Sequence, residues 1–491
     1  MEALVLAAGE GSRLGKLTKR KPKALLRVAG MPLLGRILHG LKEAGVRDVW
    51  IVVGYKADVI REKIGANYAG LNIQFVEAKR WKKGNLYSLL AAQEIFQQNF
   101  LLCMCDHIFD AEIPKSLINN GSKKALVLAI DKVSEEDTKV LEQNGKILDI
   151  GKKINRSDVA IDTGFFLCSP KIFEYANEAA QQGAKELADC VRVAGRNGDT
   201  QVVDVSGHLW ADIDTKQDLD RAKRLLVEDS QKKRGPSDFV AHHLNRPIEN
   251  AILYRISDWL FITPNRLTIA TNVLAWFVTY LFFSGHLVTG SILTFVVGIM
   301  DGLDGKLARI RRRQTRLGRM EHPFDMLYEF SWLIALALFL SRTQGLLPLE
   351  LCMFSLMFIA FYRFCYDQFS RTMKVSLDIY GRFEQTFRRV AGRRNIYNVY
   401  IFFGVIFDVP LYSLFAILFH SALTAVAYAC RASVHMHAAD RLSTLTLNAR
   451  TEESSSKNIN LRRLGTFVCN KLNRTCCPPF VAQNLGDLKA I

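Results

Sequence analysis

The sequence predicts a doubly wound α/β domain followed by an all-α membrane domain of about six transmembrane helices. Over residues 1–230, short apolar runs alternate with segments of helical periodicity, which is typical of a mostly parallel sheet covered by helices. Residues 267–435 carry apolar runs close to the roughly 20 residues that cross a bilayer. Basic residues are concentrated around those runs, as they are at the ends of membrane spans.

The first domain divides into strands and helices by the period of its apolar residues. The expected strands are 3–8, 49–54, 73–77, 100–105, 125–130, 147–150, 163–168 and 200–204. The expected helices are 33–44, 56–64, 88–96 and 215–226. The last of these is amphipathic and closes the domain.

A polar stretch that contains Gly235 and Pro236 marks the end of this domain. We therefore expect a linker and amphipathic juxtamembrane segment over 231–266 and the membrane domain over 267–435. The polar residues 436–491 lack periodicity, and we expect them to be disordered. The expected spans are 268–284, 288–307, 321–341, 346–367, 396–409 and 411–431.

The chain has a net charge of +17, which first suggests nucleic acid as a partner. The basic residues instead flank the apolar runs, so we predict contact with membrane lipid and no nucleic-acid binding. The connections at 306–319 and 371–394 are strongly basic, whereas the alternate connections are nearly uncharged. This alternation predicts a multi-pass membrane protein whose N-terminal domain and basic connections face the cytoplasm.

A glycine-rich turn follows the first strand. Its backbone lets a phosphate group approach closely and points N–H groups at it. Arg13 and, after a short interval, Lys23 add cations suited to the same phosphates. The residues of this strand end and turn that we expect to bind the phosphate-bearing ligand are Leu6, Ala8, Gly9 and Gly11.

Residues 6–14 and 22–26 resemble the L-A-A-G-x-G-x-R-L and P-K-x-L-L patterns of the sugar-nucleotidyltransferase family. Further matches at 84–89, 104–109, 161–166 and 210–215 extend the resemblance over nearly the whole domain. The resemblance implies that a phosphate monoester attacks the α-phosphorus of CTP and expels pyrophosphate. Because two polyanions must meet, Mg²⁺, arginine and lysine are expected to carry most of the catalysis.

The same resemblance implies roles for individual residues of the first domain. Asp106 and Asp212 would hold Mg²⁺, and Asn85 would contact the base of CTP. Asp214 is an alternative to Asp212 or a cap of the following helix. Asp162 is either a contact of the acceptor or a turn residue. Arg13 and Lys23 would act as catalytic cations.

Four carboxylates border the second apolar run and the start of the third. Asp301 and Asp304 are three residues apart, and Glu321 and Asp325 are four apart, so each pair shares a helix face. Charged groups at membrane depth are costly unless they are paired or functional. Oxygen ligands of this kind suit Mg²⁺, with Mn²⁺ as an alternative.

These carboxylates resemble the D-x-x-D-G-x-x-A-R-x8-G-x3-D-x3-D motif of the CDP-alcohol phosphotransferase family. Asp301, Asp304, Gly305, Ala308, Arg309 and Gly318 match in place. The motif then puts acids at 322 and 326, so Glu321 and Asp325 lie one residue early, as after a one-residue deletion.

The resemblance to this second family also implies functional roles. Asp301, Asp304, Glu321 and Asp325 would hold the metal, with His322 as a substitute for Glu321. Asp325 would also act as the base that deprotonates the acceptor alcohol. Gly305, Ala308 and Arg309 would bind the CDP-alcohol. Members of this family are typically dimeric, so a homodimer is expected.

Together the two domains resemble the bifunctional inositol-1-phosphate cytidylyltransferase / di-myo-inositol phosphate phosphate synthase family. The resemblance implies synthesis of CDP-inositol from CTP and inositol 1-phosphate, then its transfer to a second inositol 1-phosphate. The arginines of 382–394 would hold the acceptor phosphate. Two alternatives are the same chemistry on another phospho-alcohol for phospholipid synthesis, and an active cytidylyltransferase on a degenerate membrane anchor.

Overall fold

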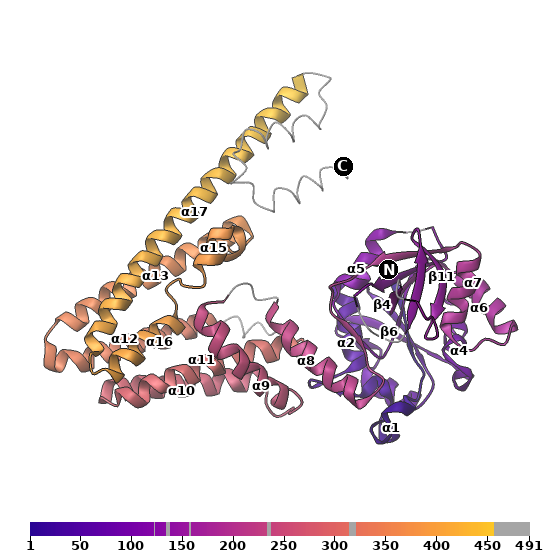
Figure 1. Ribbon diagram of the computed structural model, residues 1–491, viewed down its shortest axis with the longest axis horizontal. Helices are drawn as coiled ribbons and strands as arrows, with labels where there is room; N and C mark the ends of the chain where they lie inside the picture. Colours follow the sequence, from indigo (N-terminus) through magenta and orange to yellow (C-terminus); the bar gives the residue numbers. More distant parts are fainter. Residues whose placement is uncertain (122, 134–137, 157–158, 233–236, 314–320, 456–491) are drawn as a thin grey trace. The chain divides into compact units, whose positions relative to one another are not determined.

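The computed structural model describes residues 1–121, 123–133, 138–156, 159–232, 237–313 and 321–455, and only the backbone of 232, 321 and 442–455. The chain forms two compact units (Figure 1). The first unit comprises Met1–Ser230, Ile252–Ile262 and Leu307–Arg313. The second comprises Gln231–Ala251, Thr263–Lys306 and the residues from Gln314 on.

The first unit is an α/β fold built on a ten-stranded sheet. Its centre is parallel and has the order β7-β1-β4-β6, with bounds Phe100–Met104, Glu2–Ala7, Asp48–Val53 and Leu71–Glu77. Each crossover between successive parallel strands carries a helix. The chain adds β4 and β6 on one side of β1 and then returns to place β7 on the other side. The predicted doubly wound sheet is confirmed in this half.

The other half of the sheet is antiparallel for the most part, so the sheet as a whole is mixed. β12 runs antiparallel to both β7 and β9, and β13 returns parallel to β9. β10 and β11 form a hairpin through Asn144 and Gly145, both with positive φ, which is the turn geometry that joins antiparallel strands. The bounds are β9 Leu126–Asp131, β10 Lys139–Gln143, β11 Lys146–Gly151, β12 Ala160–Cys168 and β13 Thr200–Asp204, with β5 Asn67–Tyr68 at the far edge.

Helices cover both faces of this sheet, and this explains why the sequence of β1 is almost entirely apolar. Ala3, Val5 and Ala7 pack into one core, whereas Leu4 and Leu6 pack into the other. Successive side chains of a strand point to opposite faces, so a doubly covered strand needs an unbroken apolar run. The first core also contains residues of α2 (Leu33–Glu43), α3 (Ala57–Ile64) and α5 (Glu112–Asn120).

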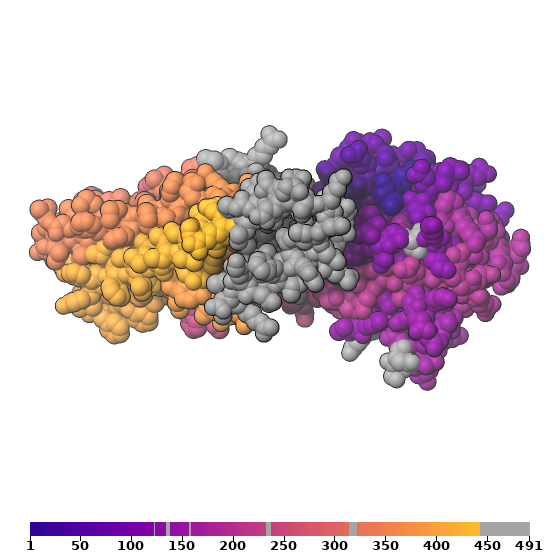
Figure 2. All heavy atoms as spheres, turned by 90° about the horizontal axis from the view of Figure 1, so that it is seen from above, coloured from indigo at the N-terminus to yellow at the C-terminus, as the bar shows by residue number. Residues whose placement is uncertain are grey.

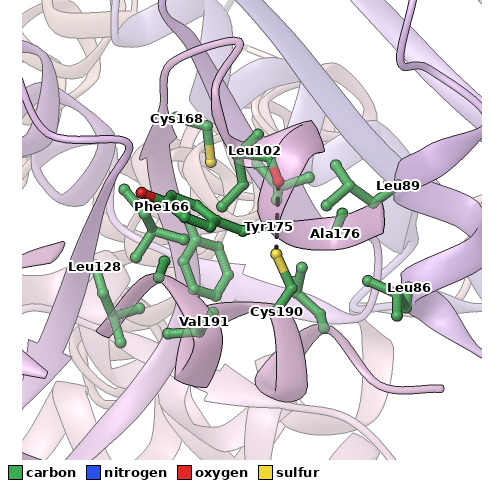
Figure 3. Packing of buried hydrophobic residues seen from close by; sticks show 14 of the residues in the cluster. Leu86, Leu89, Leu102, Leu128, Phe166, Cys168, Tyr175, Ala176, Cys190 and Val191 are labelled. Carbon is green, nitrogen blue, oxygen red and sulfur yellow. Dashed lines mark hydrogen bonds between the residues drawn. The ribbon is translucent and has the colours of Figure 1, made fainter. Parts of the chain in front are cut away.

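The second core lies beneath α4 (Asn85–Leu90), α6 (Ile172–Gln181) and α7 (Leu187–Arg196). Figure 3 shows Leu86, Leu102, Phe166 and Val191 meeting there, with the Cys190 thiol donating to the Ile172 carbonyl at 3.7 Å. α4 is shorter than the predicted helix 88–96 and begins three residues earlier, at a glycine turn that borders the site described below.

Short elements connect these layers. Two strands, β8 (His107–Phe109) and β14 (Trp210–Asp212), form a separate antiparallel pair. The others are η1 Ser12–Leu14, α1 Lys16–Arg20, η2 Lys23–Leu25, β2 Arg27–Val28, β3 Met31–Pro32, η3 Trp81–Lys83 and α8 Lys216–Lys232. The predicted closing helix is therefore present and extends beyond 226.

The second unit is helical. Five helices in the described part of the chain are long and apolar enough to cross a membrane, and large apolar side chains such as Val273, Phe364 and Phe419 lie exposed on them. Figure 2 shows the outer face of the later helices in orange to yellow. Apolar side chains exposed in this way are suited to contact with the acyl chains of lipid. The five helices are α10 Pro264–Ser284, α11 Leu287–Ile310, α12 Glu321–Gln344, α13 Leu347–Met373 and α17 Pro410–Ser455. Shorter helices are η4 Ala241–Asn245, α9 Arg246–Ile256, α14 Leu377–Tyr380 and α15 Arg382–Phe387.

The count of six spans is not confirmed. The expected span at 396–409 is α16, whose 13 residues (Arg394–Ile406) rise about 20 Å, against the roughly 30 Å of a hydrocarbon core. α17 continues through Ser455, so its helical backbone extends past residue 435, where we expected the membrane domain to end. Of the tail predicted to be disordered, residues 456–491 lie outside the described part.

Candidate functional sites

A pocket of about 340 Å³ opens at the carboxyl ends of β1 and β7 in the first unit. Ligands of parallel α/β sheets bind at this edge because the loops that follow the strands converge there. The predicted residues Leu6, Ala8, Gly9, Gly11, Arg13, Lys23, Asn85 and Asp106 all line the pocket. The sequence reasoning missed Trp81, Lys82 and Ser88, which line it from η3 and α4.

Gly11 shows why the turn after β1 must be glycine. Its φ is +69°, and a Cβ atom there would lie 2.8 Å from Cβ of Lys23. The bare backbone therefore lets the stem of Lys23 pass directly beside the turn. Thr18 fixes the same turn, since its hydroxyl donates to the Gly11 carbonyl at 3.1 Å.

Lys23 is buried at the floor of this pocket between two carboxylates. Its Nζ lies 2.7 Å from Oδ2 of Asp106 and 2.7 Å from Oδ1 of Asp214. Burial alone would lower the pKa of Lys23, but Asp106, Asp212 and Asp214 outweigh it and raise this pKa above its ordinary value. The lysine is therefore a fixed positive charge in the pocket.

Asp106, His107 and Asp212 form the one group of three His, Cys, Asp or Glu residues in the described part of the chain whose ligand atoms lie close enough together to hold a metal ion. One ligand atom from each residue lies within 4.8 Å of the others, because β14 pairs with β8 and places Asp212 opposite His107. His107 is a ligand candidate that the sequence reasoning missed, although its place directly after Asp106 was the signal.

The chemistry of this group fits a divalent cation. Oδ1 of Asp106 and Nδ1 of His107 are buried 3.0 Å apart, and among the described residues neither atom has a partner with hydrogen-bond geometry. Burial and the charge of Asp106 raise the pKa of Asp212 to about 6, although His107 opposes them. Burial also raises the pKa of Asp106, but Lys23 and His107 reverse this and hold it below its ordinary value. A divalent cation bound here would replace the proton of His107 and neutralise the carboxylates of Asp106 and Asp212.

Asp214 occupies a different position from Asp212. Its carboxylate pairs with Lys23 and, at 2.5 Å, with the guanidinium of Arg13. The alternative role of helix cap falls instead to Thr215 and Asp218: the Asp218 carboxylate accepts from the N–H of Thr215 at 2.6 Å, and the Thr215 hydroxyl accepts from the N–H of Asp218 at 3.2 Å.

Asp162 holds a turn beneath His107. Its Oδ1 accepts a hydrogen bond of 2.7 Å from the N–H of Gly164, whose φ is +73°. A Cβ atom on Gly164 would lie 2.7 Å from Cε1 of His107, so the imidazole rests on bare backbone. Burial raises the pKa of Asp162 to about 6, although the Gly164 N–H and His107 act against it.

The second set of predicted residues lies in the helical unit. Asp301 and Asp304 are buried in α11. Asp301 forms an ion pair with the guanidinium of Arg394, and Asp304 accepts a hydrogen bond of 2.6 Å from the Thr268 hydroxyl. Asp325 on α12 accepts a hydrogen bond of 3.1 Å from the Tyr328 hydroxyl. In the part of the chain whose side chains are described, these acids do not form a three-ligand group like that of the first unit.

The remaining predicted residues of the second motif border these acids in sequence. The side chain of Glu321 is outside the described residues, and Gly318 is as well. His322 is 86% exposed, with Nδ1 4.0 Å from Asp325 Oδ2. Gly305 and Ala308 lie near the end of α11, where Arg309 donates to the Ser230 carbonyl at 3.0 Å.

Close helix packing surrounds the first two acids. A Cβ atom on Gly302 would lie 2.2 Å from Oε1 of Glu249 in α9, so glycine is needed for this approach. Glu249 in turn pairs with Lys306, one turn further along α11, and both side chains are buried. α9 is thereby fixed against the part of α11 that carries Asp301 and Asp304.

The fold and the two sets of residues define a nucleotidyltransferase-type α/β domain joined to a helical membrane domain with buried carboxylates. Residues 3–193 match the family model for the MobA-like NTP transferase domain, and residues 261–392 match that for CDP-alcohol phosphatidyltransferase. Both activity classes predicted from the sequence are therefore confirmed at the level of the domain families.

Relatives that carry both domains are named "Bifunctional IPC transferase and DIPP synthase". The protein from Aquifex aeolicus is 35% identical over 70% of this chain and 79% of its own. That from Thermococcus kodakarensis is 33% identical over 68% of this chain and 75% of its own. The chain belongs to this family. Among solved structures, the inositol-1-phosphate CTP transferase from T. maritima is 27% identical over 47% of this chain and 96% of its own, with a TM-score of 0.41.

Proposed function

We propose that this chain catalyses two consecutive reactions. In the first, CTP and inositol 1-phosphate give CDP-inositol and pyrophosphate. In the second, CDP-inositol and another inositol 1-phosphate give di-myo-inositol phosphate phosphate and CMP. The observation that carries the proposal is a nucleotide-type pocket with a buried lysine on the same chain as buried carboxylates in an apolar helix. The names of relatives that share both domains support inositol as the alcohol.

In the first reaction, an oxygen of inositol 1-phosphate attacks the α-phosphorus of CTP and the bond to pyrophosphate breaks. Lys23 and Arg13 would neutralise the charge that builds up on the phosphates, and the turn around Gly9 would donate backbone N–H groups. Asn85 and Trp81, which line the pocket, would contact the base. Asp106, His107 and Asp212 would hold Mg²⁺ or Mn²⁺, which supplies further charge neutralisation when bound.

In the second reaction, a hydroxyl of the acceptor attacks the phosphorus that carries inositol, and the bond to CMP breaks. Asp325 would accept the hydroxyl proton. Asp301 and Asp304, with Glu321 as a candidate, would hold the metal that neutralises the diphosphate. Gly305, Ala308 and Arg309 would contact the CDP group.

The acceptor phosphate would bind to the basic segment before α16. Arg388 and Arg393 lie 3.0 and 3.4 Å from the Asp378 carboxylate, so their positions are fixed by one buried acid. Arginine is suited to such phosphate binding because its guanidinium presents several donors in one plane. Alanine at Arg393 should therefore raise the acceptor KM, and an unchanged KM would exclude the assignment.

We also propose that both sites face the cytoplasm and that the protein is a homodimer. The basic connections support the orientation, since basic residues favour the cytoplasmic side. The family resemblance of the membrane domain supports the dimer. Cross-linking in native membranes tests the dimer, and accessibility of single introduced cysteines to membrane-impermeant reagents tests the orientation.

The test of the proposed function uses membranes that contain the protein, with CTP, Mg²⁺ and radiolabelled inositol 1-phosphate. CDP-inositol should appear first and a water-soluble phosphodiester later. CDP-inositol alone would show that the second site is inactive. A product that partitions into organic solvent would point to phospholipid synthesis, and no product would exclude inositol 1-phosphate as the substrate.

A further inference from the structure

Arg394 lies at the centre of a polar network inside the helical unit. It is the first residue of α16, and its guanidinium pairs with Asp301 of α11 and with Glu329 of α12, the latter at 3.5 Å. Its side chain is only 13% exposed. A charge buried to this degree is retained only with partners that neutralise it, and here two carboxylates do so.

Tyr328 connects this network to Asp325. The tyrosine is fully buried, accepts a hydrogen bond from Arg394 and donates one of 3.1 Å to Oδ1 of Asp325. Its ring packs against Trp332 with 5.1 Å between the ring centroids. Trp332 is itself fixed, since its Nε1 donates to the Ala275 carbonyl of α10 at 2.8 Å. The core of the bundle therefore sets the position of the Tyr328 hydroxyl.

We propose that Tyr328 and Arg394 are positioning residues for phosphodiester formation. A continuous chain of contacts runs from Asp301 through Arg394 and Tyr328 to Asp325, and it joins the acids of α11 and α12. These contacts fix the rotation of the Asp325 carboxylate and the distance between Asp301 and Asp325. This inference rests on the proposed function, which makes Asp325 the base and Asp301 a metal ligand.

The two residues act through the acids rather than on the substrate. A base must be held within about 0.5 Å of its productive position to accept a proton efficiently. The positive charge of Arg394 also opposes binding of a divalent cation to Asp301. Removal of Arg394 should therefore strengthen metal binding while it weakens catalysis, a combination that general loss of structure does not produce.

The neighbouring arginine belongs to another cluster. Arg393 pairs with Asp378, whereas Arg394 pairs with Asp301, so adjacent residues of one segment have separate partners.

A matched control for Tyr328 is Tyr400, also on a helix of the bundle, whose hydroxyl lies 2.9 Å from Nδ1 of His420. Replacement of either tyrosine by phenylalanine keeps the ring and removes one hydroxyl.

The experiment uses the full-length enzyme in detergent, supplied directly with CDP-inositol and inositol 1-phosphate. Tyr328→Phe should lower kcat for phosphodiester formation about tenfold, with KM nearly unchanged, because a hydrogen bond to a charged group is lost. Arg394→Gln should lower kcat about a hundredfold, and Arg394→Lys should recover part of it. Tyr400→Phe should keep the wild-type rate.

Two further measurements separate positioning from structural damage. The Tyr328→Phe/Arg394→Gln double variant should be no slower than Arg394→Gln alone, because residues of one network are not additive. Mn²⁺ titration by EPR, taken as the difference from an Asp301→Asn variant, should show tighter binding in Arg394→Gln. Weaker Mn²⁺ binding together with lost turnover would overturn the inference.

The outcomes for the inference and for the proposed function are distinct. If the wild type makes phosphodiester and both Tyr328→Phe and Arg394→Gln retain its kcat, the inference fails and the function stands. If the wild type makes none from CDP-inositol, the proposed second reaction fails and the inference fails with it.

Discussion

At the scale of single residues, Lys23 is the strongest point of the first site. It neutralises Asp106 and Asp214 from within the pocket. Lys23→Ala should lower CDP-inositol formation about a hundredfold to a thousandfold, as loss of one fixed donor at a reacting phosphate does. The rate is measured by release of pyrophosphate from CTP.

Lys21 provides the control for this variant. It lies two residues earlier, is exposed and does not line the pocket, so Lys21→Ala should retain the wild-type rate. Equal losses in both variants would mean that charge in the loop, and not the buried position of Lys23, is what matters.

Asp162 provides a pH dependence that belongs to one carboxyl group. Burial raises the pKa of Asp162 to about 6 in the folded chain, above the ordinary value near 3.8. Between these values the folded state holds a proton that the unfolded state has released, so this contribution to stability is present at low pH and is lost as pH rises through about 6. At neutral pH, burial of the ionised Asp162 lowers the free energy of unfolding by about 2 to 3 kcal/mol.

The variant Asp162→Asn should remove this pH dependence while it keeps an oxygen for the Gly164 N–H. Relative to the wild type, its melting temperature should rise as pH increases from about 4 to about 7. Thermal unfolding of the full-length protein across this range measures the difference. Parallel curves for the two proteins would show that Asp162 titrates near its ordinary pKa.

At the scale of elements, the patterns predicted what local chemistry determines. β1 and the turn after it were predictable because an unbroken apolar run bounded by glycines is typical of a strand that is covered on both faces. The antiparallel half of the sheet was not, since strand pairing depends on contacts such as β12 with β9 that are remote in sequence. The apolar composition of α16 predicts a membrane span, but the helix begins at Arg394 and has only 13 residues.

The same limit applies to the sites. Asp106 and Lys23 were predicted from sequence patterns, and His107 directly follows Asp106, whereas the approach of Asp212 to both depends on the pairing of β8 with β14 across a long interval of sequence. Tyr328 and Arg394 are further examples, since nothing local to 328 indicates a partner at 394. Motifs therefore pointed to candidate site residues, whereas the contacts those residues make with partners remote in sequence are visible only in the structure.

Gly84 gives a prediction at the scale of a turn. It precedes α4 with a φ of +131°, and a Cβ atom there would lie 2.1 Å from the Lys185 carbonyl oxygen. That carbonyl also accepts from the Leu86 N–H at 3.2 Å, and Asn85 accepts from the Leu187 N–H at 2.7 Å. Gly84→Ala should cost about 2 to 4 kcal/mol, through backbone strain and the clash together, and should raise the KM for CTP.

Gly183→Ala isolates the conformational part of this cost. Gly183 has a φ of +82°, and among the described residues no atom other than those of its two chain neighbours lies within 4 Å of the position its Cβ would take. Its cost should be about 1 to 2 kcal/mol, with an unchanged KM for CTP. Thermal unfolding and CTP titration of both variants test the argument, and equal effects on stability and KM would contradict it.

At the scale of the whole molecule, one chain carries a site that makes a CDP-alcohol and a site that consumes one. The proposed reactions are linked only through CDP-inositol, which is a soluble molecule. Each site can then be disabled without direct effect on the other. Lys23→Ala removes the cation of the first, and Asp304→Asn removes a carboxylate of the second while it keeps an acceptor for the Thr268 hydroxyl.

The two variants should therefore complement each other when separately prepared membranes are mixed. With CTP and inositol 1-phosphate, Lys23→Ala alone should make no phosphodiester, and Asp304→Asn alone should accumulate CDP-inositol. The mixture should form the phosphodiester after a lag, because the intermediate must diffuse between membranes. Added CDP-inositol should restore synthesis by Lys23→Ala directly, which shows that its second site is intact. If that addition succeeds while the mixture stays inactive, CDP-inositol is passed between sites without release.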